Sequence, residues 1–145
     1  MTTAERGKHL RIVAELLLVH LPAVLEDQEL TRDLLSVVGV TLRAAYEDAL
    51  RSAEVWDRKH YHQRAERLRE EWTWALAAAN TADGLAYRDA PVTVDNLERL
   101  QRLIRPPLEA PVRCLIRQPQ SFRGAAQARE RQERERRRVP GRSLV

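Results

Sequence analysis

The sequence has little cysteine, aromatic side chain or glycine: one Cys, 5% aromatic residues and 5 Gly among 145 residues. The single cysteine, Cys114, cannot form an internal disulfide, which excludes a disulfide-stabilised fold and favours a reducing compartment. Few aromatic residues and few glycines disfavour a sheet, because strands are rich in aromatic and β-branched side chains and their turns use glycine. We therefore predict an all-α protein.

Long apolar runs are also missing. No stretch approaches the roughly 20 apolar residues that a membrane-spanning helix requires. Residues 1–24 lack the layout of a signal peptide, because Glu15 and His20 interrupt the apolar run and no small-residue cleavage site follows it. These features predict a cytoplasmic protein without membrane association.

Motifs for catalysis, cofactors and metals are not found either. His60 and His62 are two residues apart and diverge on a helix, whereas zinc-binding helices place histidines at i and i+4. There is no glycine-rich phosphate loop, no GxSxG turn and no Cys/His nucleophile pair. We predict no metal ion, no cofactor and no catalytic residues, and thus a protein that is not an enzyme.

The charge is unevenly distributed. The net charge is +4, yet residues 119–145 contain 8 Arg and 3 Glu, while residues 1–118 contain 17 basic and 18 acidic residues. All basic residues except Lys8 and Lys59 are arginine, whose planar guanidinium can bind two phosphate oxygens at once. This division predicts a helical domain over 1–118 and an Arg-rich tail over 119–145.

Apolar residues recur at helical spacing in four segments. The second segment, for example, places on one stripe Leu35, Val38, Leu42, Ala45, Ala49 and Trp56. The predicted helices cover residues 3–20, 29–57, about 62–82 and 93 onward. Four helices with short connections predict an up-down-up-down four-helix bundle.

Several residues predict where these helices bend or end. Pro22 predicts a kink or restart late in the first helix, Gly84 a C-terminal cap of the third, and Thr93 the N-cap of the fourth. The pair of prolines at 106–107 predicts that the fourth helix breaks and resumes from Pro107 or Pro111 to about Arg117. The polar tail predicts a solvated helix or disorder, with disorder after Arg138.

The third helix contains Trp72 and Trp74, which a helix should direct to nearly opposite sides, because two residues turn the chain by about 200°. We predict a core face of Tyr61, Ala65, Leu68, Trp72, Leu76 and Ala79. Trp74 would then point outward, as a simple exposed side chain, as a base-stacking surface, or as a subunit interface that Ala77 and Ala78 let a second helix approach.

Basic residues of the third helix, of the segment before the tail and of the tail are candidate nucleic-acid contacts. Many are mixed with acidic residues, so each alone could equally be an ordinary surface charge. The candidates are Arg58, Lys59, Arg64, Arg67, Arg69, Arg113, Arg117, Arg123, Arg129, Arg131, Arg134, Arg136, Arg137 and Arg138.

The order and length of the helical segments resemble a known family. The segments are "LRIVAELLLVHLP", "LTRDLLSVVGVTLRAAYEDAL", "AERLREEWTWALAAAN" and "VTVDNLERLQRLI" with "VRCLIR", spanning residues 10–117. The local matches are Pro22, the step Leu68–Arg69 followed by Trp72 and Trp74, and Thr93. This pattern resembles the accessory variability determinant proteins of diversity-generating retroelements, and the four-helix proteins encoded in ribosomal RNA intervening sequences.

The resemblance implies a noncatalytic accessory protein that forms a homopentamer and scaffolds RNA, or an RNA/DNA hybrid, with a reverse transcriptase during mutagenic reverse transcription. It also implies that Arg69 contacts nucleic acid. The chain departs from the family pattern at Thr73, where another basic residue is usual, and at the prolines of the fourth helix. The alternative is a helical protein–protein adaptor without specific nucleic-acid binding, in which the tail only aids solubility.

Overall fold

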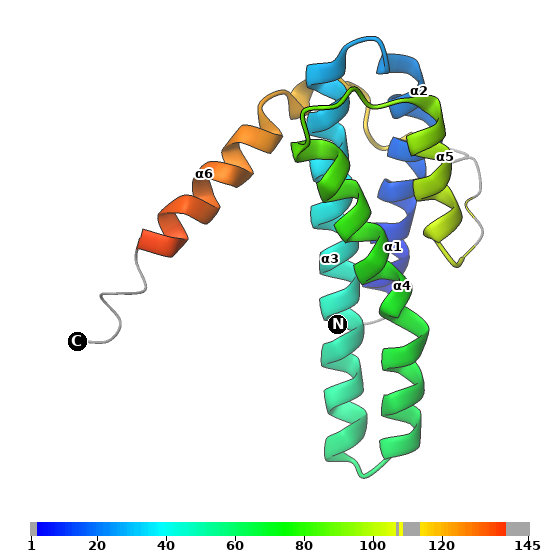
Figure 1. The fold of residues 1–145 in the computed structure, drawn as a ribbon. Coiled ribbons are helices and arrows are strands. Elements are labelled where there is room, and N and C mark those ends of the chain that lie inside the picture. Colours follow the sequence, from blue (N-terminus) through cyan, green and yellow to red (C-terminus); the bar gives the residue numbers. More distant parts are fainter. Residues whose placement is uncertain (1–2, 107, 109–113, 139–145) are drawn as a thin grey trace.

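The computed structural model describes residues 3–106, 108 and 114–138, which are largely helical (Figure 1). In chain order the elements are α1 (Thr3–Glu15), the π-helix η1 (Leu16–His20), α2 (Leu21–Val24), α3 (Gln28–Arg58), α4 (His62–Tyr87), α5 (Val94–Leu103), the 3₁₀-helix η2 (Pro119–Phe122) and α6 (Ala125–Arg138). No strand occurs in these described segments, and the predicted all-α class is confirmed.

Helices α3 and α4 form a long antiparallel hairpin around which the other helices are placed. In Figure 1, α1 and α5 lie along only the upper part of this hairpin, with α1 and α4 rising and α3 and α5 descending. The lower part is the two-helix hairpin alone, and α6 leaves the upper end to one side. The predicted alternation of direction is present, but a regular bundle of four comparable helices is not confirmed.

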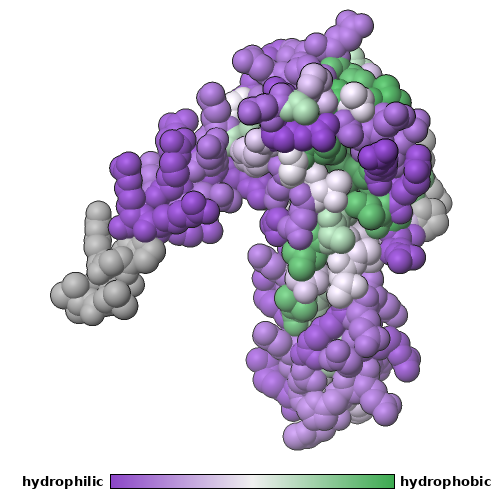
Figure 2. Space-filling view, viewed as in Figure 1, coloured by the Kyte–Doolittle hydropathy of each residue, from purple (hydrophilic) through white to green (hydrophobic). Residues whose placement is uncertain are grey.

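The core lies where α1, α3, α4 and α5 meet. Of the predicted α3 stripe, Leu35, Val38, Leu42, Ala45 and Ala49 are fully buried, which confirms its helical phase, whereas Trp56 at its end is half-buried. Figure 2 shows hydrophobic surface mainly over the upper part of the molecule, while the lower hairpin and α6 are hydrophilic. This distribution follows from the lengths of α1 and α5, which cover only part of α3 and α4.

Helix α1 is anchored to α3 by a buried ion pair. Arg6 donates to Asp48 at 3.0 Å and to the hydroxyl of Ser52 at 3.0 Å. The Asp48 side chain is only 1% exposed. A buried charge that loses its partner is strongly unfavourable, so this pair fixes the position at which α1 meets the hairpin.

The predicted disturbance near Pro22 occurs in the turn before it. The N–H of Leu21 donates to the carbonyl of Leu16, a π-helical bond across five residues, and the helix then continues to Val24. Proline lacks an N–H and its ring crowds the preceding turn, and a π-helical turn is one way in which a helix accommodates such an irregularity.

The end of α4 differs from the prediction. The helix runs through Gly84 to Tyr87, so the predicted C-cap at Gly84 is wrong. Leu85 and Ala86, which follow the glycine, are buried in the core, and their burial favours continuing the helix past a weak helix former. The predicted N-cap at Thr93 is confirmed, because its hydroxyl accepts a hydrogen bond from the N–H of Asn96 in a capping box.

The orientation predicted for Trp74 is also wrong. Its side chain faces the core and is 8% exposed, and its ring centroid lies 5.4 Å from that of half-buried Trp72. Tyr61, predicted in the core, is 56% exposed instead. The buried face of α4 contains Trp74, Ala75 and Ala78. The guanidinium carbon of Arg6 lies 5.6 Å from the ring centroid of Trp72.

Helix α5 ends at Leu103, so the predicted break before the proline pair is confirmed. Residues 107 and 109–113 lie outside the described residues, and residues 114–118 are not helical, so the predicted helix to Arg117 is wrong there. This segment is held by Glu15, whose buried carboxylate accepts from the N–H groups of Leu115 at 2.6 Å and Ile116 at 2.8 Å. His20 lies 2.6 Å from the same carboxylate.

Candidate nucleic-acid interface

The predicted nucleic-acid contacts fall into two groups, those that carboxylates neutralise and those that stand exposed. Arg69 donates to Asp57, and Arg123 donates to Asp27. Arg129 donates two hydrogen bonds to Asp83, at 2.6 and 2.9 Å. Since each of these guanidinium groups is paired within the fold, it offers less charge to a phosphate than an unpaired one.

The loop end of the α3–α4 hairpin carries the first exposed group. We define the hairpin tip as residues 56–67. Arg58, Lys59, Arg64 and Arg67 are exposed there, and none of the four forms an ion pair with another described residue. The nearby carboxylate of Asp57 accepts hydrogen bonds from Arg69 and His62 instead, so the tip keeps an excess of positive charge.

Two hydrogen bonds lower the pKa of the Asp57 carboxyl. A hydrogen bond from Arg69, and a second from His62, hold the pKa of the Asp57 carboxyl below its ordinary value of 3.8. The carboxylate therefore stays ionised at neutral pH and remains committed to Arg69. By the same pairing, the pKa of Arg69 is raised.

Aromatic rings lie among the tip cations. The guanidinium of Arg64 is 4.3 Å from the ring centroid of Trp56, and the ammonium of Lys59 is 5.7 Å from it. Tyr61 meets the same indole edge-on, with centroids 5.7 Å apart and planes at 82°. These cation–π contacts hold the long basic side chains in place on a half-buried ring.

The turn between the two helices is tight and contains no glycine. His60 has a φ of 68°, and the N–H of Tyr61 donates to the carbonyl of Trp56 at 2.9 Å. This geometry raises the rings of residues 60–62 around a hollow of about 590 Å³. Its lining residues are His60, Tyr61, His62, Gln63, Arg64 and Arg67.

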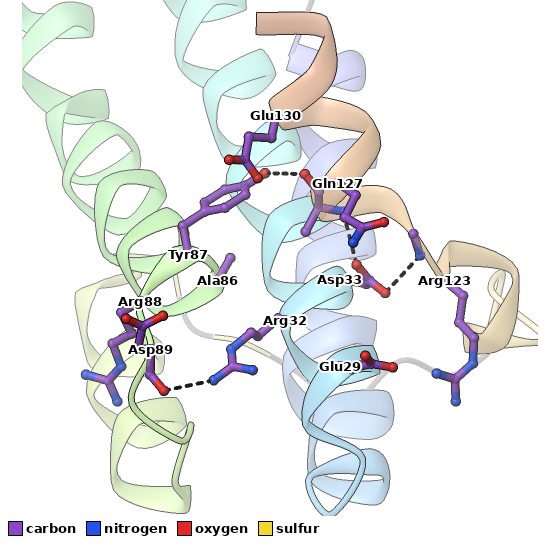
Figure 3. Close-up of a pocket in the computed structure, with 12 residues that line it drawn as sticks. Glu29, Arg32, Asp33, Ala86, Tyr87, Arg88, Asp89, Arg123, Gln127 and Glu130 are labelled. Carbon is purple, nitrogen blue, oxygen red and sulfur yellow. Dashed lines mark hydrogen bonds between the residues drawn. The ribbon is translucent and has the colours of Figure 1, made fainter. Parts of the chain in front are cut away.

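A second hollow, of about 430 Å³, lies where α6 meets α3 and the end of α4 (Figure 3). The carboxylate of Asp33 accepts from the N–H groups of Gly124 at 2.9 Å and Ala126 at 3.1 Å, which satisfies donors at the start of α6. The Tyr87 hydroxyl donates to the carbonyl of Ala126 at 3.0 Å. Helix α6 is thus attached through polar contacts.

Arg129 fixes the first turns of α6 to the hairpin. Its partner Asp83 also accepts two hydrogen bonds from Arg43, at 2.7 and 3.1 Å, so one carboxylate joins α3, α4 and α6. The bond to Asp83 raises the pKa of Arg129. Ahead of α6, the bond from Arg123, with a second from the N–H of Leu30, holds the pKa of Asp27 below 3.8.

The rest of α6 forms the second exposed group. As predicted for the alternative of a solvated helix, residues 125–138 are helical, and their distal part is exposed. In Figures 1 and 2 this part projects from the hairpin and is hydrophilic. Its exposed arginines are Arg131, Arg134, Arg136, Arg137 and Arg138, among which Glu130, Glu133 and Glu135 are interspersed.

Two further candidates lie between α5 and α6. Arg117 is exposed, whereas Arg113 lies outside the described residues. Of the three residues predicted at a subunit interface, Trp74 and Ala78 are buried within the chain, and only Ala77 is exposed. The buried pair therefore presents no surface to a partner in this conformation.

Metal ligation and membrane insertion find no support in the described part of the chain. In the ranges 3–106 and 114–138 and at residue 108, no cluster of three or more His, Cys, Asp and Glu side chains could hold a metal ion. No helix among these same residues combines the length and apolar character needed to cross a membrane.

Comparison of the chain with protein-family models, curated proteins and solved structures gives no match. The residues that sequence reasoning missed are the rings of the hairpin tip, because the apolar spacing predicts Tyr61 in the core and Trp56 on the apolar stripe of the second helix. The available signal was their position among four basic residues, since aromatic rings interleaved with arginine are typical of single-strand binding.

Proposed function

We propose that this protein is a noncatalytic nucleic-acid-binding protein that contacts the phosphate backbone through the hairpin tip and the distal part of α6. The observation that supports this proposal is the exposure of four tip cations, Arg58, Lys59, Arg64 and Arg67, none paired with a described acidic residue. Cations already paired within a fold must break that pairing before they bind phosphate, whereas these four need not.

Two features favour the phosphate backbone of a nucleic acid as the ligand. The exposed cations are spread over the tip and along α6, which suits an extended polyanion better than a compact ligand. Most of them are arginines, and one guanidinium can bind two oxygens of the same phosphate.

We further propose that the partner is RNA or an RNA/DNA hybrid, and that the protein acts as a homo-oligomeric accessory subunit of a diversity-generating retroelement reverse transcriptase. The support for this narrower proposal is the resemblance of residues 10–117 to accessory variability determinant proteins, which also suggests a pentamer. Copurification with the reverse transcriptase and a solution mass of five chains would support it. A monomer that does not bind the reverse transcriptase would contradict it.

The experiment for nucleic-acid binding is a salt titration followed by fluorescence anisotropy of a labelled oligonucleotide. Each phosphate contact contributes about 0.7–0.9 to the slope of log K against log salt. The double variant Arg64→Gln with Arg67→Gln should therefore lower the slope by about 1 to 2. Arg99→Gln with Arg102→Gln is the matched control, because it removes two exposed arginines on α5, away from the tip.

A parallel variant replaces the five distal arginines of α6 by glutamine. If the tip and α6 both contact phosphate, each set of substitutions should reduce the slope, and the combined protein should bind least. A wild-type slope near zero would refute the proposal. Retention of a protein partner by a chain that binds no polynucleotide would instead favour the helical adaptor.

A further inference from the structure

Building on the proposed function, we infer that the hairpin tip is a site for unpaired nucleotides, and that the protein prefers single-stranded nucleic acid to duplex. The observation is the hollow of about 590 Å³ in which three exposed rings, of His60, Tyr61 and His62, are placed beside Arg64 and Arg67. The site thus joins flat surfaces for bases with cations for phosphates.

Tyr61 is the main stacking surface. Its ring is 56% exposed and stands nearly perpendicular to the ring of Trp56, with the two planes at 82°. More than half of the side chain is thus open to solvent, and a base stacked on an aromatic side chain contributes about 1–3 kcal/mol. Bases in a duplex are already stacked on each other and cannot reach such a face without unpairing.

Arg64 supplies a second flat surface. Its guanidinium covers the Trp56 ring on one side at 4.3 Å, and the arginine is itself exposed. Guanidinium planes accept stacked bases in single-stranded RNA recognition, so the indole fixes Arg64 in a position to receive one. Arg67, at the edge of the same hollow, is available for the adjoining phosphate.

The backbone at His60 places its side chain at the hollow. A φ of 68° is uncommon for a residue with a side chain, and glycine would adopt it without strain. Histidine at this position places an imidazole at the rim of the hollow, with its centroid 6.0 Å from that of His62. The N–H groups of His60 and Tyr61 donate to the carbonyls of Asp57 and Trp56, both at 2.9 Å, which is the usual left-handed end of a helix. The end of α3 therefore holds this imidazole beside the hollow.

The test compares full-length protein binding to oligouridine, oligodeoxythymidine and a blunt duplex of similar length, about 12 nucleotides, at one salt concentration. Single strands should bind at least about tenfold more tightly than the duplex. Tyr61→Ala should weaken single-strand binding by about 5- to 150-fold, the equivalent of one stacked base, and leave duplex binding unchanged. Tyr61→Phe, which keeps the ring, should bind like the wild type.

Two further variants complete the design. His60→Gly should fold, because glycine suits the turn, and should weaken single-strand binding through loss of the ring. Val94→Ala is the matched control, because Val94 has the same 56% exposure as Tyr61 but lies on α5. It should bind like the wild type, and circular dichroism should show equal helix content throughout.

The outcomes separate this inference from the proposed function. Equal affinity for single strands and duplex, or a Tyr61→Ala variant that binds single strands normally, would overturn the preference for unpaired nucleotides and leave phosphate binding intact. No binding to any of the three oligonucleotides would overturn both. Selective loss of single-strand binding in Tyr61→Ala would support both.

Discussion

Replacing Gly39 by alanine should release α6 from the hairpin. Gly39 lies in α3 beneath the ion pair between Asp83 and Arg129. A Cβ atom at this position would lie 1.9 Å from Oδ1 of Asp83 and 3.3 Å from Nη1 of Arg129. The short Asp83 side chain must rotate away, and it would then leave the cations that it joins.

The expected cost follows from the hydrogen bonds that this rotation breaks. Asp83 and Arg129 are mostly buried, with side chains 16% and 17% exposed, and charged hydrogen bonds of this kind contribute about 1.5–3 kcal/mol. Alanine in a helix is about 0.5–1 kcal/mol more favourable than glycine. Gly39→Ala should therefore lower the free energy of unfolding by about 1–2 kcal/mol. Gly84→Ala, with nothing within 4 Å, should raise it by about 0.5–1 kcal/mol.

Urea unfolding and limited trypsin digestion measure the two consequences. Gly39→Ala should unfold at lower urea, and its α6 arginines should be cleaved sooner than in wild type or Gly84→Ala. In an Asp83→Ala background the clash disappears, so adding Gly39→Ala should become neutral or stabilising. If Gly39→Ala costs the same whether or not Asp83 is present, the steric reasoning is refuted.

Two other ion pairs give predictions. Asp48→Ala should lower the free energy of unfolding by about 3–5 kcal/mol, since it leaves the buried guanidinium of Arg6 without a counter-charge; a loss below about 1 kcal/mol in urea unfolding would contradict this. The folded pKa of Asp27 lies below 3.8, so its pairing stabilises the fold above pH 3.8, and this contribution is lost as the pH falls through the folded value. Asp27→Asn should therefore show a weaker loss of stability below about pH 4 than the wild type, and identical acid unfolding curves would exclude this contribution.

The positions of the longer helices could be predicted from periodicity, most securely in α3. Most of its branched apolar residues lie on one broad face, so one helical phase buries most of them, and Leu35, Val38 and Leu42 are fully buried. Thr93 was predictable as a cap because its hydroxyl accepts from the N–H of Asn96, and the Asn96 side chain accepts from the N–H of Thr93, within four residues. Signals of this kind are local and survive without knowledge of the tertiary fold.

The buried face and the end of α4 could not be predicted in the same way. Its alanines occupy several faces and mark no single stripe, so the tryptophans appeared to decide the phase. In the structure both indoles are accommodated, because Trp74 enters the core and Trp72 lies against Arg6 from α1. The end of α4 was missed for a related reason, since burial of Leu85 by other helices outweighs the local preference of Gly84.

The candidate site was predictable by residue type but not by pairing. Sequence reasoning placed Arg64, Arg69 and Arg123 in one class, yet only Arg64 stands clear of carboxylates. Arg123 pairs with Asp27, which lies 96 residues away, and this distance in sequence carries no local signal. The turn between α3 and α4 lies where the limits of the predicted helices place it, but no glycine marks the positive φ at His60.

The arginines of this chain therefore have two uses. Some pair with carboxylates and hold the fold together, and others are exposed and available to a ligand. Asp83 and Asp27 attach the tail through Arg129 and Arg123, which explains how a helix with no buried residue of its own is held at a defined place. Salt acts unequally on the two uses, because exposed charges are screened more than partly buried pairs. A rise in salt that abolishes nucleic-acid binding while α6 stays attached thus reports on the exposed arginines alone.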